Sequence, residues 1–242
     1  MAADPEPVYT QSWTTAGWDL NNFMSGFSYT SGNAYASFNK DNTPWKKLDA
    51  ASDTPISGSF TMVLDLKNSS VVYTPDQLAG NSTGQDIFSI QFGDSAERNL
   101  ELQVQGGTDA GLKLVEDVQT SNTTTTSTTL TLDRLSSWTT ITLIADWEQQ
   151  QLSLYAGSDL VGRIENWTTT DAKAMTGIQF GSQLDGGGSG VSMSNTIQGE
   201  MLINNVAIYN GAQYQLVPEP ATATLSLLAL AGLCARRRRQ AA

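Results

Sequence analysis

The sequence contains no histidine, and its one cysteine, Cys234, lies within an apolar run near the C-terminus. A Ser-His-Asp triad and a histidine-ligated zinc or iron site are therefore excluded. The rest of the sequence offers neither a thiol nucleophile nor a disulfide. A folded domain here must be held together by its apolar core.

Basic residues are also scarce, with 13 Lys and Arg against 24 Asp and Glu and a formal net charge of -11. Four of those basic residues are adjacent arginines near the C-terminus, so the rest of the chain is more acidic still. Nucleic acid and anionic lipid are poor partners for such a chain. Only 15% of residues are charged, and the remaining polarity comes from Ser, Thr, Asn, Gln and Gly, which favours strands and turns.

Alternating apolar and polar residues recur along the chain and are separated by Gly, Asn and Asp turns. No long stretch before the C-terminal apolar run has helical periodicity. This pattern predicts an all-β fold of two antiparallel sheets packed face to face. The predicted strands lie at 59–66, 87–92, 100–104, 112–114, 138–147, 152–154, 178–180 and 199–209.

Two segments carry a family resemblance. Trp138-Thr-Thr-Ile-Thr-Leu-Ile-Ala-Asp, followed by residues 152–162, resembles the central hairpin of LamG-like, concanavalin A-type jelly rolls. Residues 199–210, Gly-Glu-Met-Leu-Ile-Asn-Asn-Val-Ala-Ile-Tyr-Asn, are similar to the closing strand of that family. The resemblance implies a jelly-roll sandwich. We expect this domain to cover residues 9–215, after an N-terminal extension of residues 1–8.

The C-terminal segment has three ordered parts: a Pro-Glu-Pro triplet, an apolar run over 221–235 and an arginine cluster. About 15 apolar residues make a helix of roughly 22 Å, shorter than the usual membrane span. The arginines hold their end on the cytoplasmic side. The parts that carry this pattern are Pro218, Glu219 and Pro220, then Arg236, Arg237, Arg238 and Arg239.

This arrangement resembles the PEP-CTERM sorting signal of exopolysaccharide-producing Gram-negative bacteria, and we assign it to residues 216–242. The resemblance implies a short hydrophobic helix that anchors the chain transiently in the inner membrane. It also implies an exosortase, a membrane cysteine protease, as a transient partner that removes the segment near the triplet. The mature protein is then expected at the cell surface or in the extracellular matrix.

Export also requires an N-terminal signal peptide. The first five residues, Met-Ala-Ala-Asp-Pro, have neither a basic start nor an apolar stretch. We therefore expect the signal peptide to be encoded upstream of Met1 or to have been trimmed from the chain.

Tryptophans beside turns are candidates for carbohydrate binding, because sugars stack on aromatic rings while Asn, Asp and Gln bind their hydroxyls. Trp18, Trp45 and Trp167 stand next to turn residues, and exposed rings at these positions are the candidates for glycan binding. Partial burial over the ends of the sandwich is the other interpretation, and we favour it. Trp138 and Trp147 fall in predicted strands and are expected to pack in the core.

Some LamG-like domains bind calcium, which needs several oxygen ligands from loops. The residues of the right type are Asp41, Asn42, Asp185 and Asn210, although their spacing does not bring them together. No other cofactor is expected.

Glycoside hydrolases need two carboxylates about 5 to 9.5 Å apart. The Glu-x-Asp-x-x-Glu string of laminarinase-type enzymes is absent. The nearest pair, Asp146 and Glu148, flanks a predicted turn, where solvated acids are ordinary. Glu116 and Asp117 are adjacent, so they point to opposite faces of a strand. Catalysis is therefore not expected.

The sequence thus predicts an exported, non-catalytic protein of the cell surface or exopolysaccharide whose jelly roll binds carbohydrate. A purely structural or adhesive surface protein is the alternative, and a glycoside hydrolase is the third. The residue pattern decides neither the glycan nor the oligomeric state, nor whether the processed protein is released or retained.

Overall fold

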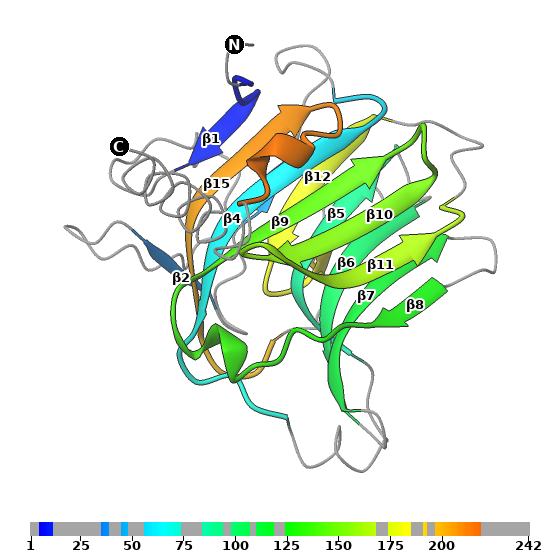
Figure 1. Ribbon diagram of the computed structural model, residues 1–242. Coiled ribbons are helices and arrows are strands. Elements are labelled where there is room, and N and C mark those ends of the chain that lie inside the picture. The colour runs from blue at the N-terminus through cyan, green and yellow to red at the C-terminus, as the bar shows by residue number, and fades with distance from the viewer. Residues whose placement is uncertain are drawn as a thin grey trace, which may run out of the picture.

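The fold consists of two antiparallel sheets packed face to face (Figure 1). The computed structural model describes residues 5–11, 35–38, 45–47, 56–73, 84–93, 98–106, 110–118, 124–167, 174–184, 191–192 and 197–218. Within these ranges the helical elements are two 3-10 turns, η2 (Arg134–Ser136) and η4 (Tyr214–Leu216). No helix in the described ranges is long and apolar enough to cross a membrane.

One sheet has seven strands in the order β1-β15-β4-β9-β10-β11, with β2 also paired to β15. Its central strands β15, β4 and β9 are the longest of this sheet. The seven strands are β1 (Tyr9–Gln11), β2 (Ala36–Phe38), β4 (Phe60–Asn68), β9 (Thr139–Asp146), β10 (Gln151–Ala156), β11 (Asp159–Glu165) and β15 (Met201–Asn210).

The other sheet has six strands in the order β3-β12-β5-β6-β7-β8. A separate pair, β13 (Gln183–Leu184) and β14 (Val191–Ser192), forms a short hairpin-like ladder. The six strands are β3 (Trp45–Lys47), β5 (Gln85–Phe92), β6 (Arg98–Gln105), β7 (Gly111–Val118), β8 (Thr124–Ser127) and β12 (Met175–Phe180).

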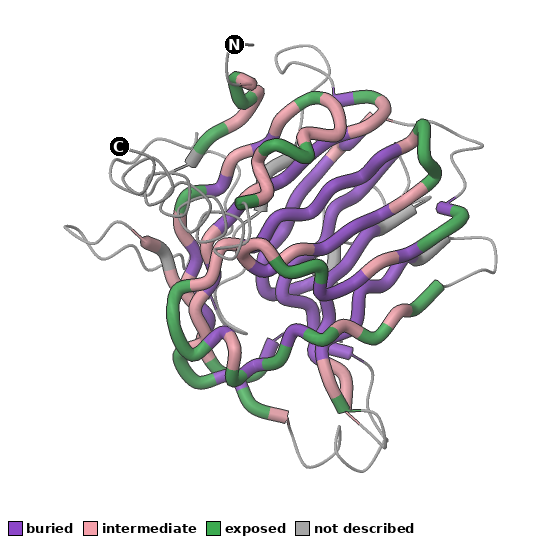
Figure 2. The backbone as a smooth tube through the Cα atoms, viewed as in Figure 1, coloured by how far each residue is buried: buried purple, intermediate pink, exposed green. Residues whose placement is uncertain are grey.

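The apolar core lies between the two sheets, where buried residues run along both inner faces (Figure 2). On β4 the residues Phe60, Met62, Leu64 and Leu66 are all fully buried, as their period of two requires. Aromatic pairs join the sheets. The Phe60 ring lies 5.8 Å from that of Phe92, centroid to centroid, and β2 and β12 contribute a second pair at 5.9 Å.

The predicted fold class, an antiparallel all-β sandwich of two sheets, is confirmed. The expected hydrophobic helix after residue 218 lies outside the described residues. The expected domain boundaries, at residues 8/9 and 215/216, stay predictions.

Candidate functional site

Most of the residues predicted from sequence to bind calcium or to carry the sorting signal lie outside the described residues. This holds for Asp41, Asn42 and Asp185, and for Glu219, Pro220 and the four arginines; Trp18, a candidate for glycan binding, also lies outside them. Asn210 ends β15, is exposed, and its carbonyl accepts a hydrogen bond from the Gln213 side chain at 2.6 Å. The described ranges hold no group of three or more acidic, His or Cys side chains suited to a metal. Calcium binding stays a prediction.

Trp167 is buried, which fits the burial favoured for the tryptophans beside turns and does not fit an exposed glycan-binding ring. Its side chain is 1% exposed and packs edge-on against Trp147, with ring centroids 5.5 Å apart. The backbone N–H of Trp167 donates to the Gln150 carbonyl at 2.8 Å, which draws the chain after β11 back over the preceding turn. That long-range bond is invisible in the local sequence. Trp45 lies in β3, opposite Gln179 of β12.

Trp138, which was expected to pack in the core, is 42% exposed. It directly precedes β9 and so shares a face with Thr140, whose neighbours Ile141 and Leu143 alternate into the core. The signal was present in the sequence, because the alternation that places Thr140 outside also places Trp138 outside. The prediction of burial followed from the size of the tryptophan side chain and not from its place in the alternation.

Asp146 serves a structural purpose that uses both of its carboxylate oxygens. Oδ1 accepts hydrogen bonds from the backbone N–H groups of Glu148, at 3.1 Å, and Gln149, at 3.0 Å, and thereby caps the turn after β9. Oδ2 accepts the Tyr214 hydroxyl at 2.8 Å. Asp146 is buried and its two oxygens accept these hydrogen bonds, while Glu148 is exposed.

The chain after β15 is fastened to the seven-stranded sheet. The Gly211 N–H donates to the Ser59 carbonyl at 2.8 Å, and the Gln213 N–H donates to the Thr61 hydroxyl at 2.8 Å. Together with the Tyr214–Asp146 bond, these contacts form what we call the C-terminal latch. Partial burial, followed by the hydrogen bond to Asp146, raises the pKa of Tyr214 to about 12.

The outer face of the six-stranded sheet carries a buried layer of polar side chains, which we call the polar face. The register places Gln179 opposite Ser89, Ser89 opposite Glu101, and Asp86 opposite Gln103, each pair on the side away from the core. Alternation predicts polar residues there, but it does not predict that they are shielded from water. The buried members are Asp86, Ser89, Gln91, Glu101, Gln103, Lys113 and Gln179.

Part of the polar face is hydrogen-bonded and part is not. The Gln103 amide donates to Glu101 at 2.6 Å and its oxygen accepts from Gln105 at 2.7 Å. By contrast, the Ser89 hydroxyl and the side-chain amides of Gln91 and Gln179 have no hydrogen-bond partner within the described part of the chain. Each such buried polar group costs roughly 1–3 kcal/mol. The unpaired side chains of this face therefore lower the stability of the fold.

Asp86 is a strongly perturbed acid of the polar face. Among the described residues, its carboxyl oxygens have no hydrogen-bond partner of good geometry. Burial raises the pKa of Asp86 well above its usual range, and the negative charge of Glu101 raises it further. The Gln103 amide favours the charged form and acts in the opposite direction without cancelling the other two. The folded state therefore holds a proton on Asp86 that the unfolded chain releases at lower pH.

We expect Asp86→Asn to stabilise the protein in a pH-dependent manner. The wild type loses stability as pH rises from about 3.9, the ordinary carboxyl pKa, through the raised pKa of folded Asp86. The gain from the substitution is thus near zero at acid pH and grows with pH. Denaturant unfolding at several pH values measures it, with the exposed Glu165→Gln as control. A gain that does not change with pH would contradict the assignment.

Tyr214→Phe should weaken the C-terminal latch. Loss of a hydrogen bond to a carboxylate on a partly exposed tyrosine lowers the free energy of unfolding by about 1 kcal/mol. Because the folded pKa is raised from about 10, this contribution is present below pH 10 and disappears as pH rises through about 12. Exchange of the Val217 amide hydrogen, which donates to the Tyr214 carbonyl, should accelerate. Tyr209→Phe on β15 is the matched control; equal effects of the two variants would refute the latch.

Comparison with known proteins finds a sorting motif at the C-terminal end and a similar fold for the body. The family model described as "PEP-CTERM protein-sorting motif" matches residues 216–239. No curated protein sequence matches the chain. Two similar solved structures are the botulinum neurotoxin serotype G binding domain, with 14% identity over 92% of this chain, and the serotype D binding domain, with 11% over 86%.

These two structures have TM-scores of 0.52 and 0.55, and this chain spans 50% and 48% of their respective lengths. At such low identity the likeness shows the fold alone. The motif, for its part, indicates export, membrane-associated sorting through the C-terminal segment and recognition by an exosortase. The chain therefore carries a PEP-CTERM protein-sorting motif over residues 216–239, behind a β-sandwich with the fold of lectin-like binding domains.

Proposed function

We propose that this chain is a non-catalytic protein of the cell surface or exopolysaccharide matrix. Its β-sandwich binds carbohydrate after an exosortase has removed the C-terminal segment. The observation that carries this proposal is the order of the two parts. A lectin-like sandwich closes with β15, and the sorting motif begins at Leu216, only six residues beyond the end of that strand.

Carbohydrate is the ligand class that the body favours. Polar but mostly uncharged side chains, with an exposed tryptophan, suit neutral hydroxyl-rich ligands. The net charge of -11 opposes nucleic acid and anionic lipid. Solved neighbours of the same fold are described as binding domains. Both oxygens of Asp146 hold the backbone and Tyr214, which argues against its use as a hydrolase carboxylate.

In an exosortase-containing Gram-negative host, the secreted protein should lack the peptide that follows the Pro218-Glu219-Pro220 region. The triplet and the arginine cluster are the features that the processing enzyme would recognise. Intact-mass spectrometry of the secreted material measures the cut. A variant with all three triplet residues changed to Ala is the control and should stay uncut. Secreted protein that still carries Arg236 would overturn the proposed processing.

The processed protein should bind to a carbohydrate array. Because sugars stack on aromatic rings and their hydroxyls bind polar side chains, we expect a signal on neutral polysaccharides. The array is run once with calcium and once with chelator. The comparison tests the proposed calcium ligands, which are Asp41, Asn42, Asp185 and Asn210. Heat-unfolded protein serves as the control for non-specific adhesion. No signal under either condition would favour the purely structural or adhesive alternative.

A further inference from the structure

Two aromatic side chains meet on the outer face of the seven-stranded sheet. Trp138 directly precedes β9, and Tyr35 directly precedes β2. Their ring centroids lie 5.8 Å apart, with the ring planes tilted by 55°. Trp138 is 42% exposed, and Tyr35 is half-buried. The pair therefore offers a large aromatic surface that is already open to solvent.

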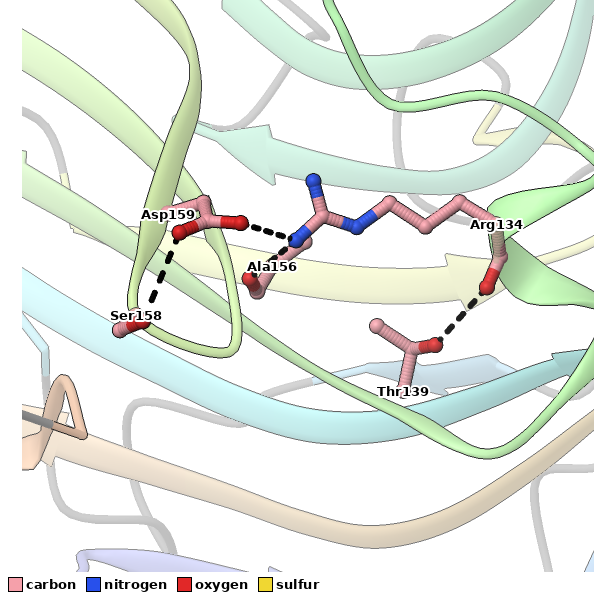
Figure 3. A network of polar contacts seen from close by, with 5 residues as sticks. All are labelled: Arg134, Thr139, Ala156, Ser158 and Asp159. Atoms are coloured by element: carbon pink, nitrogen blue, oxygen red, sulfur yellow. Dashed lines mark hydrogen bonds and ion pairs between the residues drawn. The ribbon is translucent and has the colours of Figure 1, made fainter. Parts of the chain in front are cut away.

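Hydrogen bonds hold the turn that precedes β9, and Figure 3 shows those made by Arg134 and Thr139. The Thr139 hydroxyl donates to the Arg134 carbonyl at 3.1 Å, which ties η2 to the start of β9 on either side of the tryptophan. The Arg134 guanidinium in turn donates to the Ala156 carbonyl at 3.0 Å and to the Asp159 carboxylate at 2.6 Å. These bonds join η2 to the hairpin of β10 and β11, so the backbone that presents Trp138 is held from both sides.

A carboxylate lies beside the aromatic pair. Asp65 of β4 accepts the Thr140 hydroxyl at 2.6 Å and the Asn205 side-chain amide at 2.7 Å, one on each oxygen. Thr140 is two residues after Trp138, so both project from the same face of the sheet. A carboxylate has about four acceptor positions. Asp65 is half-buried and, with two of these used, can still accept hydrogen bonds from a ligand.

A β-bulge in β15 sets the position of Asn205. The pairing of β15 with β4 shifts register between Asn204 and Ala207, and Asn205 has a φ of 49°, in the left-handed region. Its N–H is held by the Asn204 side-chain oxygen at 2.8 Å. Bulges re-aim side chains and are frequent beside functional sites. Asn205 is exposed, so the face of its amide that is turned away from Asp65 is open to water.

We propose that Tyr35, Trp138, Asp65 and Asn205 form a glycan-binding site, here called the aromatic–acid platform. Its ligand is an uncharged pyranose unit of a polysaccharide. The apolar face of the sugar stacks on the aromatic pair, and neighbouring hydroxyls donate to Asp65 and accept from Asn205. The Asp65 carboxylate and the net charge of -11 disfavour uronic and sialic acids.

This assignment rests on the proposed carbohydrate binding and gives it a location. The polar face of the opposite sheet is the competing location, since the side-chain amides of Gln91 and Gln179 lack hydrogen-bond partners among the described residues. Gln91 and Gln179 are however fully shielded from solvent, so a sugar would need an opening movement to reach them. The aromatic–acid platform needs none.

Isothermal titration of the full chain with cellohexaose, maltohexaose and xylohexaose tests the site, with oligogalacturonate as the acidic probe. At least one neutral probe should bind more tightly than oligogalacturonate. Trp138→Ala should weaken that binding about tenfold or more, since it removes the stacking surface. Trp138→Phe should stay within about threefold of wild type, and Asp65→Asn should lose several-fold. Ligand-induced change in tryptophan fluorescence should shrink in Trp138→Phe even where affinity persists.

Two controls separate binding from folding. Leu160→Ala removes an apolar side chain of equal exposure, 43%, from β11 and should leave affinity unchanged. Gln179→Ala tests the polar face and should also leave it unchanged. If a neutral probe binds but Trp138→Ala has no effect, the platform is refuted and the proposed function stands. If no probe binds the wild type, the platform is refuted, and the array decides the proposed function.

Discussion

The contact between the inner faces of the two sheets holds this domain together, because the sequence before the C-terminal apolar run has no cysteine to form a disulfide. Fully burying one large apolar side chain contributes roughly 1.5–3 kcal/mol. Strand alternation supplies such side chains along β4, β5, β6 and β9, and the Phe38–Phe180 and Phe60–Phe92 pairs join the sheets directly. Because the core stabilises the fold, the outer faces of the two sheets can differ. That of the six-stranded sheet carries buried polar side chains, and that of the seven-stranded sheet carries the exposed Trp138.

Three aspartates on those outer faces show how the surroundings decide what a carboxylate does. Asp146 is buried, but donors satisfy both of its oxygens, so it organises a turn and holds the C-terminal latch. Asp65 has one donor on each oxygen and keeps acceptor capacity toward solvent. Asp86 lies buried beside Glu101 with no well-placed donor, and its pKa rises. One residue type thus serves as a cap, as a ligand-facing acceptor and as a source of strain.

The sequence predicted the class of fold because a period of two is a local property that survives packing. The alternation in β4 appears in the structure as predicted, Ile141, Leu143 and Ala145 of β9 enter the core as predicted, and the two sheets form the face-to-face sandwich. Burial of the outer layer was not predictable, since it depends on what packs over Ser89, Gln91 and Gln179 rather than on their neighbours in sequence.

The positions of two tryptophans have different causes. The backbone N–H of Trp167 bonds to Gln150, seventeen residues earlier, a contact that no local pattern encodes, and the Trp167 side chain is buried. Trp138 lies outside because it is in phase with Thr140, which the alternation had already assigned to the outer face. The platform residues illustrate the same limit. Tyr35 and Trp138 are about a hundred residues apart, and only the pairing of β2, β15, β4 and β9 in one sheet brings their rings together.

Only a short segment of chain separates the folded body from its sorting motif. Tyr214 is held by Asp146, and Pro218 follows four residues later, a span of at most about 14 Å even when fully extended. While the C-terminal latch is closed, an enzyme acting at the Pro-Glu-Pro triplet therefore works close to the surface of the seven-stranded sheet. A contact of about 1 kcal/mol opens often without unfolding the sandwich, because the sandwich is held by its core and not by this segment. The body can thus stay folded while the segment that follows it is released.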